Sequence, residues 1–137
     1  MPTPPAGPQP ASAPIGAYRP VVEAGPWLIC SGQLGIAPHA VGDDAGPQLV
    51  EGAAAQATQA LEGARRLLAE HGAGLGDVVK TTVFLVDMDD FTAVDRAYAA
   101  FFGEHRPARS MVGVAALPLG ARVEVEVWAY RTGQQGA

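Results

Sequence analysis

The stretch ARVEVEVWAYR, residues 121–131, alternates strictly between small apolar side chains and larger polar or aromatic ones. A period of two residues is that of a β-strand, whose successive side chains point to opposite faces of the sheet. One face carries Val123, Val125, Val127 and Ala129. The other carries Arg122, Glu124, Glu126, Trp128 and Tyr130. A face that met only water would seldom hold two large aromatic rings, so this strand predicts a sheet with apolar groups on both sides.

The stretch before it, PARSMVGVAALP at residues 107–118, predicts a neighbouring strand over 109–117 that ends in a turn at Pro118. Alternation places Arg109 and Met111 on one face of this strand and Val112 on the other. Arg109 therefore enters a sheet rather than lying at a loop tip.

Two interpretations of Arg109 stay open at this point. It could be a structural arginine paired with Glu124 or Glu126 across adjacent strands. It could instead hold a ligand, because a planar guanidinium matches a carboxylate with two parallel hydrogen bonds.

Two helices are predicted from apolar residues at helical spacing, over residues 48–72 and 87–105. Gly52 and Gly63 fall inside the first helix, where each costs roughly 1 kcal/mol relative to alanine, and a close approach to the sheet is one way to recover that cost. An acidic residue, Asp89 or Asp90, is expected to cap the second helix.

Three further strands complete the pattern, over residues 18–25, 27–34 and 77–87, the first two joined by a turn at Gly25 and Pro26. The order of strands and helices predicts one α+β domain with both helices on one face of a mixed sheet. Because the helices can cover only that face, the simplest way to bury the apolar groups of the other is oligomerisation.

Composition sets the remaining bounds. The chain has 137 residues and a formal net charge of −5, which argues against binding to nucleic acid or anionic lipid driven by overall charge. We expect a flexible proline-rich arm over 1–14, a single domain over 15–132 and a short tail over 133–137. Without a secretory signal or an apolar run long enough to span a membrane, a cytoplasmic protein is the default expectation.

Cysteine and histidine offer little chemistry in this chain. Cys30 is the only cysteine and is expected to be a small core residue. His39, His71 and His105 are far apart in sequence, without the spacing of metal ligands, and the last two are expected near helix ends.

Six segments, in order and at matching distances, resemble the RidA/YjgF family of reactive enamine/imine deaminases. They are IGAYRP (15–20), WLICSGQLG (27–35), GDVVKTTVFLVDMDDF (76–91), YAAFFGEH (98–105), PARSMVGVAALP (107–118) and RVEVEVWA (122–129). The most specific motif is P-A-R-S followed fifteen residues after the arginine by a glutamate.

The resemblance implies a chorismate-mutase-like fold, with a mixed sheet of about six strands and two helices on one face. It also implies a homotrimer around a central β-barrel, with sites in clefts between subunits. The implied reaction is hydrolysis of 2-imino acids and their enamine tautomers to 2-keto acids and ammonia, without a metal or organic cofactor.

The same resemblance assigns roles to individual residues. Arg109 is similar to the arginine that binds the substrate carboxylate, and Tyr18 to a tyrosine that lines the same cleft from another subunit. Ser31 and Gly32 match residues of the pocket wall, and Glu124 matches a glutamate that positions or activates water.

Three features depart from the family pattern. Met111 stands where many members have cysteine, Asp95 stands where asparagine is common, and Arg106 alone separates the second helix segment from P-A-R-S. Both Met111 and Asp95 are expected to contact the substrate.

Other functions and roles remain open from the sequence. Tyr18 could be an ordinary packing residue, and Glu124 only a partner for the arginine. The same scaffold could bind a keto acid as a regulatory trimer without turnover. An endoribonuclease is disfavoured by the acidic charge and the lack of an aromatic and basic groove. A chorismate mutase would rest on fold alone, which does not carry function.

Overall fold

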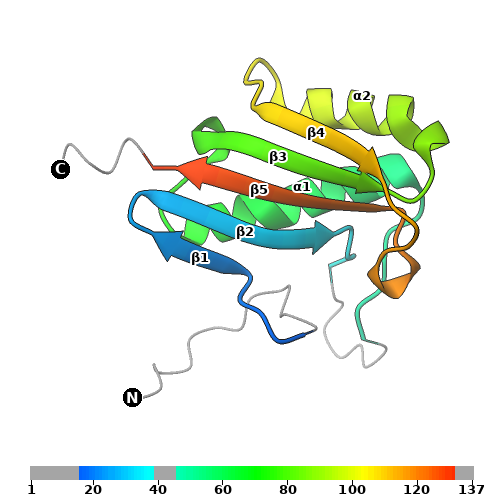
Figure 1. Ribbon diagram of the computed structural model, residues 1–137, viewed down its shortest axis with the longest axis horizontal. Helices are drawn as coiled ribbons and strands as arrows, with labels where there is room; N and C mark the ends of the chain where they lie inside the picture. The colour runs from blue at the N-terminus through cyan, green and yellow to red at the C-terminus, as the bar shows by residue number, and fades with distance from the viewer. Residues whose placement is uncertain (1–15, 39–45, 132–137) are drawn as a thin grey trace.

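The alternating stretch 121–131 forms the central strand of a single sheet (Figure 1). The computed structural model of the protein describes residues 16–38 and 46–131. The strands are β1 (Val21–Ala24), β2 (Trp27–Leu34), β3 (Val78–Leu85), β4 (Ala108–Gly113) and β5 (Val123–Tyr130). Within the described residues the sheet has five strands, in the order β1-β2-β5-β3-β4, so the expectation of about six is wrong.

The sheet is mixed, as predicted. β1 with β2, β2 with β5, and β5 with β3 pair antiparallel, whereas β3 and β4 pair parallel. A parallel pair needs a crossover connection, and the second helix supplies it between β3 and β4. β4 is therefore an edge strand that contacts β3 and not β5.

Both helices, α1 (Ala53–Glu70) and α2 (Phe91–Phe102), cover the same face of the sheet (Figure 1). α1 begins later than predicted because Gly52, which was expected inside the helix, has a φ of 91° and precedes it. Gly63 does lie inside α1, and a Cβ there would sit 3.1 Å from the Gln33 Oε1 atom, so the helix approaches the sheet closely at this glycine.

The core lies between this helix layer and the sheet. The predicted apolar face of β5 is buried along its whole length: Val123, Val125, Val127 and Ala129 are each at most 1 % exposed. Cys30 is buried beside them, as expected, and burial raises the pKa of its thiol to about 12.

The other face of the sheet has no helix over it in the described residues, and it is rich in aromatic side chains. The rings of Trp27 and Trp128 meet edge to face with centroids 6.0 Å apart, and Tyr130 packs against Trp27 at 5.1 Å. Trp27 and Trp128 are still 36 % and 39 % exposed, and Val22 and Val112 on the same face are exposed as well. The prediction of apolar groups on both sides of the sheet is confirmed.

The ends of some elements differ from the predictions. Neither Asp89 nor Asp90 caps α2 with its side chain; Asp87 instead accepts a hydrogen bond from the Asp89 N–H, in a 3₁₀ turn (Met88–Asp90) that leads into the helix. β4 ends at Gly113 rather than continuing to 117. His71 does lie at the end of α1, with its Nδ1 atom 3.0 Å from the Leu67 carbonyl oxygen.

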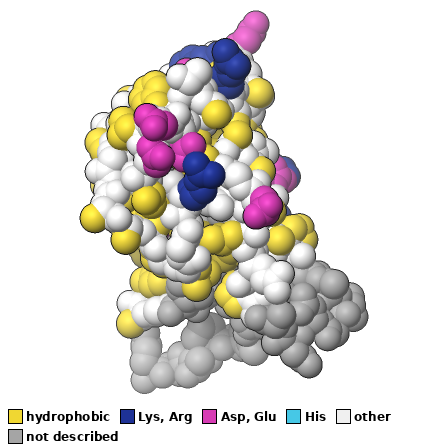
Figure 2. All heavy atoms as spheres, turned by 90° about the vertical axis from the view of Figure 1, so that its right-hand side faces the viewer, with side chains coloured by type: hydrophobic (Ala, Val, Ile, Leu, Met, Phe, Trp, Pro, Cys, Tyr) yellow, Lys and Arg dark blue, Asp and Glu magenta, His cyan; other side chains and the backbone are white. Residues whose placement is uncertain are grey.

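Three predictions made from the sequence fall outside the described residues. They concern the arm 1–14, the tail 133–137 and His39. The face shown in Figure 2 carries charged side chains of both signs between hydrophobic ones, with no broad basic patch among its described residues. No helix in the described ranges is long and apolar enough to cross a membrane.

Candidate functional site

Arg109 and Glu124, the two residues with the strongest assigned chemistry, lie on opposite faces of the sheet. Arg109 pairs with Thr81 across the β4–β3 ladder, and Thr81 pairs with Val127 of β5. Directly paired residues share a face, and Thr81 and Val127 are buried under the helices, so Arg109 lies on the helix-covered face. Glu124 alternates with the buried valines of β5 and therefore lies on the uncovered face.

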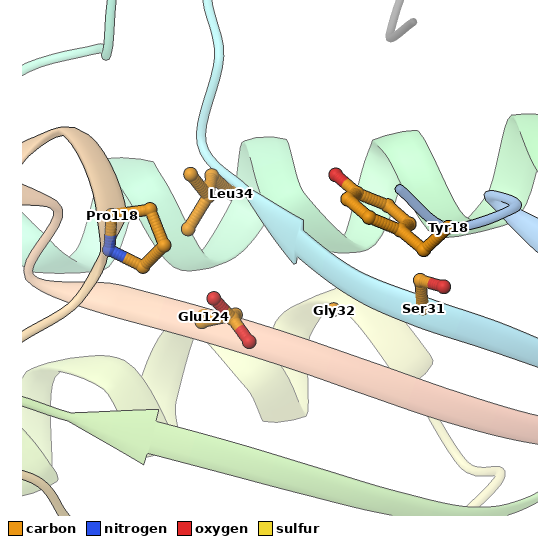
Figure 3. A pocket seen from close by; sticks show the side chains of 6 residues that line it. All are labelled: Tyr18, Ser31, Gly32, Leu34, Pro118 and Glu124. Carbon is orange, nitrogen blue, oxygen red and sulfur yellow. The ribbon is translucent and has the colours of Figure 1, made fainter. Parts of the chain in front are cut away.

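Glu124 lies in a pocket of about 290 Å³, here called the glutamate pocket (Figure 3). It is lined by Tyr18, Ser31, Gly32, Leu34, Pro118 and Glu124. β5 supplies the carboxylate, β2 the wall beneath it, and the segment before β1 the tyrosine, which lies over Ser31 (Figure 3). Four predicted site residues are therefore neighbours in one chain: Tyr18, Ser31, Gly32 and Glu124.

Local hydrogen bonds explain how Tyr18 reaches this pocket. The Ser31 hydroxyl donates to the Arg19 carbonyl at 2.6 Å, and the Ser31 N–H donates to the Pro20 carbonyl at 2.8 Å. These two bonds hold the segment after Tyr18 against β2. The register of β2 against β5 also shifts between Cys30 and Gln33, next to the pocket, where irregular pairing commonly re-aims side chains.

Glu124 makes no ion pair or hydrogen bond through its carboxylate within the described ranges. Burial raises the pKa of this carboxyl above its ordinary value of 4.5, and the nearby charge of Glu126 raises it further. A carboxyl group with a raised pKa exchanges a proton more readily near neutral pH, as a general acid or base must.

Gly32 leaves the space that the Glu124 side chain occupies. A Cβ at position 32 would sit 2.2 Å from Glu124 Oε2 and 2.7 Å from its carboxyl carbon. No other residue type fits there unless the carboxylate moves.

We expect Glu124→Gln to stabilise the fold at neutral and higher pH. Because the pKa of Glu124 is raised in the folded state, the folded protein holds this proton more tightly than the unfolded chain does. Its stability therefore falls as pH rises from about 4.5 through the raised pKa, and glutamine removes this penalty. Thermal unfolding should give a higher Tm for the variant above pH 7 and an equal Tm below the ordinary pKa. The exposed Glu70→Gln serves as a control, and an unchanged Tm difference across this range would contradict the assignment.

Arg109 lies at the edge of a second cleft, of about 330 Å³, here called the arginine pocket. It is lined by Asp95, Tyr98, Ala99, Arg106, Pro107 and Arg109. The Arg109 Nη1 atom donates to Asp95 Oδ1 at 2.7 Å, and the guanidinium carbon lies 4.8 Å from the centre of the Tyr98 ring. The ring of Phe91 lies on the same guanidinium at 5.9 Å.

This geometry corrects the structural interpretation of Arg109. Glu124 and Glu126 are not its partners, because β3 separates β4 from β5 and Glu124 lies on the other face. The anionic partner is Asp95 of α2, which was expected to contact substrate. Met111, also expected at the site, packs against the hydrophobic core and is not among the residues that line either pocket.

Tyr98 and Phe91 are members of the site that the sequence did not single out. The Tyr98 hydroxyl is hydrogen-bonded to the Thr81 hydroxyl at 2.7 Å in the buried interior, which fixes the ring under the guanidinium. The available signal is spacing: Phe91, Asp95 and Tyr98 are four and three residues apart and so share one side of a helix. Among the described residues, no three His, Cys, Asp or Glu side chains gather where they could hold a metal ion.

Comparisons with known proteins agree with this architecture. The family model Endoribonuclease L-PSP matches residues 9–131. The 2-iminobutanoate/2-iminopropanoate deaminase of Salmonella typhimurium is 41% identical over 124 residues, which cover 88% of this chain and 92% of that protein. The crystal structure of the Escherichia coli YjgF gene product has a TM-score of 0.80 and 40% identity, covering 90% of this chain and 94% of that one.

A further similar structure contains a small molecule. The E. coli protein TdcF, solved with bound serine, has a TM-score of 0.80 and 33% identity and covers 90% of this chain and 95% of that chain. The match of the family model over most of the sequence, together with identities near 40% to named relatives, places this chain in the RidA/YjgF family, whose family model carries the name Endoribonuclease L-PSP.

Proposed function

We propose that this protein hydrolyses reactive 2-imino acids and their enamine tautomers to 2-keto acids and ammonia. The observation that carries the proposal is the pair of half-sites, one presenting a guanidinium and the other a carboxyl of raised pKa. The relatives named 2-iminobutanoate/2-iminopropanoate deaminase support it, as does the amino acid held by TdcF.

The two half-sites act together only if two copies of the chain meet. One copy holds Arg109 on the helix-covered face and Glu124 on the uncovered face, so a single chain cannot close both groups around one small molecule. In a cyclic assembly, the arginine pocket of each copy faces the glutamate pocket of the next. The uncovered face carries the exposed side chains of Trp27, Trp128, Val22 and Val112. These apolar groups favour burial of that face between copies of the chain. We propose a homotrimer of chorismate-mutase-like subunits around a central β-barrel.

Arg109 binds and orients the substrate. Its guanidinium donates two parallel N–H hydrogen bonds to the planar carboxylate of the imino acid, next to the C=N carbon. Orientation of the substrate alone can lower the reaction barrier by several kcal/mol. The positive charge also stabilises the negative charge that tautomerisation spreads toward the carboxylate.

Glu124 activates the attacking water and transfers protons. Its carboxylate takes a proton from a water molecule as the water oxygen bonds to the carbon of the protonated imine, and the C=N electron pair moves onto the nitrogen. In the resulting carbinolamine, Glu124 gives its proton to the amino nitrogen. The C–N bond then breaks, ammonia leaves, and the hydroxyl proton passes to the Glu124 carboxylate as the keto group forms. Tyr18, Ser31 and Gly32 shape the wall around the attacked carbon.

The direct test generates the imine in place. An amino-acid oxidase or a serine/threonine dehydratase releases the imino acid, and appearance of the 2-keto acid is followed with and without this protein. We expect the protein to accelerate imine decay and ammonia release. Decay at the buffer rate would overturn the deaminase proposal, and Arg109-dependent binding of a keto acid without turnover would favour the regulatory alternative.

We expect Gly32→Ala to lower deaminase activity about tenfold to a hundredfold, because a displacement of about 1 Å in a reacting group has an effect of this size. The added methyl displaces the end of the Glu124 side chain and leaves the backbone in place. Gly76→Ala is the matched control, since a Cβ there meets nothing within 4 Å. Equal activity of the Gly32 and Gly76 variants in the coupled assay would contradict a positioned Glu124.

A further inference from the structure

The guanidinium of Arg109 already forms an ion pair with a carboxylate of the protein itself. Asp95 Oδ1 accepts from Arg109 Nη1 at 2.7 Å, and the Asp95 side chain makes no other hydrogen bond in the part of the chain that the structure describes. The Asp95 side chain is 47% exposed and that of Arg109 is 24% exposed, so the carboxylate lies at the mouth of the arginine pocket.

This pair weakens the site for a ligand that is only an anion. A ligand carboxylate on the free N–H groups of Arg109 places a second negative charge within a few ångströms of Asp95. The two carboxylates then repel each other and share one guanidinium. Arg106 also lines this pocket, but its guanidinium donates to the Ala99 and Gly103 carbonyl oxygens at the end of α2 and, among the described residues, forms no ion pair with Asp95.

A ligand with a positive charge beside its carboxylate is instead attracted by Asp95. In a protonated 2-imino acid, the cationic nitrogen is bonded to the carbon that carries the carboxylate. A carboxylate on Arg109 therefore brings this nitrogen close to Asp95, whose second oxygen can accept its N–H. The 2-keto acid product has a neutral oxygen at the same position, which can only accept hydrogen bonds.

We propose that Asp95 is a specificity-determining residue that makes the site favour the cationic imino acid over the keto acid derived from it. The proposal rests on the proposed function and adds a difference in affinity between substrate and product. Such a difference arises here from repulsion of one ligand as well as attraction of the other. Asp95 thereby promotes release of the keto acid after each turnover.

The selectivity proposed for Asp95 can be tested by calorimetry on the full-length protein, with two stable ligands that share one carbon skeleton. 2-Oxobutanoate represents the product, and L-2-aminobutyrate represents the cationic substrate. We expect Asp95→Asn to bind the keto acid roughly fivefold more tightly and the amino acid roughly fivefold more weakly, as for one partly exposed charge contact. The control is Glu70→Gln, which also removes one negative charge, at an exposed position on α1. It is expected to leave both affinities unchanged.

The outcomes separate this proposal from the function on which it rests. Equal shifts for both ligands in Asp95→Asn, or no shift, contradict the selectivity while leaving Arg109-dependent binding intact. Binding that is unchanged in Arg109→Met contradicts carboxylate recognition by Arg109, and this proposal with it. Opposite shifts for the two ligands, lost in Arg109→Met, support both.

Discussion

Arg109→Lys is expected to lower kcat/KM for 2-imino acids by about a hundredfold, which corresponds to the loss of a charge-assisted hydrogen bond and of the fork geometry. Lysine keeps the positive charge and can still pair with Asp95 or lie over the Tyr98 ring. It cannot present two parallel donors to one carboxylate. The loss should therefore arise in binding and orientation of the substrate, and not in folding.

The measurement is steady-state deamination of an imine released by an amino-acid oxidase, with thermal unfolding and molecular mass determined in parallel. Arg96→Lys is the matched control, because Arg96 is an exposed arginine on the same helix that carries Asp95. Equal activity of the two variants would contradict bidentate binding at Arg109. A fall in Tm or in oligomer mass that accounts for the loss would instead assign a structural role to Arg109.

The sheet and the helices could be predicted because their signals are local. The strict alternation of β5 determines which of its residues face the core, and all four apolar ones are buried. Strand order could not be predicted in the same way, since it depends on pairing between distant segments. The start of α1 was misplaced because the φ of 91° at Gly52 has no signal in the helical periodicity.

The same limit applies to the site. Residue type and motif identified Arg109 and Glu124 individually, and alternation assigned each to a face of its own strand. Whether those two faces coincide depends on β4 pairing with β3 rather than with β5. The ion pair between Arg109 and Asp95 follows from the crossover that brings α2 under β4, which sequence spacing alone did not reveal.

The location of Arg109 and Glu124 on opposite faces leads to the second large expected effect. We expect Arg109→Met and Glu124→Gln each to lose at least a hundredfold in activity, and a mixture of the two to regain it when the subunits exchange. In a mixed assembly, some contacts join the intact Arg109 of one variant to the intact Glu124 of the other. With equal random mixing around a ring, about one quarter of the sites are intact, so about one quarter of wild-type activity should return.

Denaturing and refolding the two variants together permits this exchange, and refolding each variant alone gives the baseline. The double variant Arg109→Met/Glu124→Gln mixed with wild type is the matched control, because it dilutes intact sites without creating new ones from defective halves. If one chain held a complete site, the mixture of single variants would show only the average of their residual activities. Recovery well above that average would require that the guanidinium and the carboxylate of each working site come from different subunits.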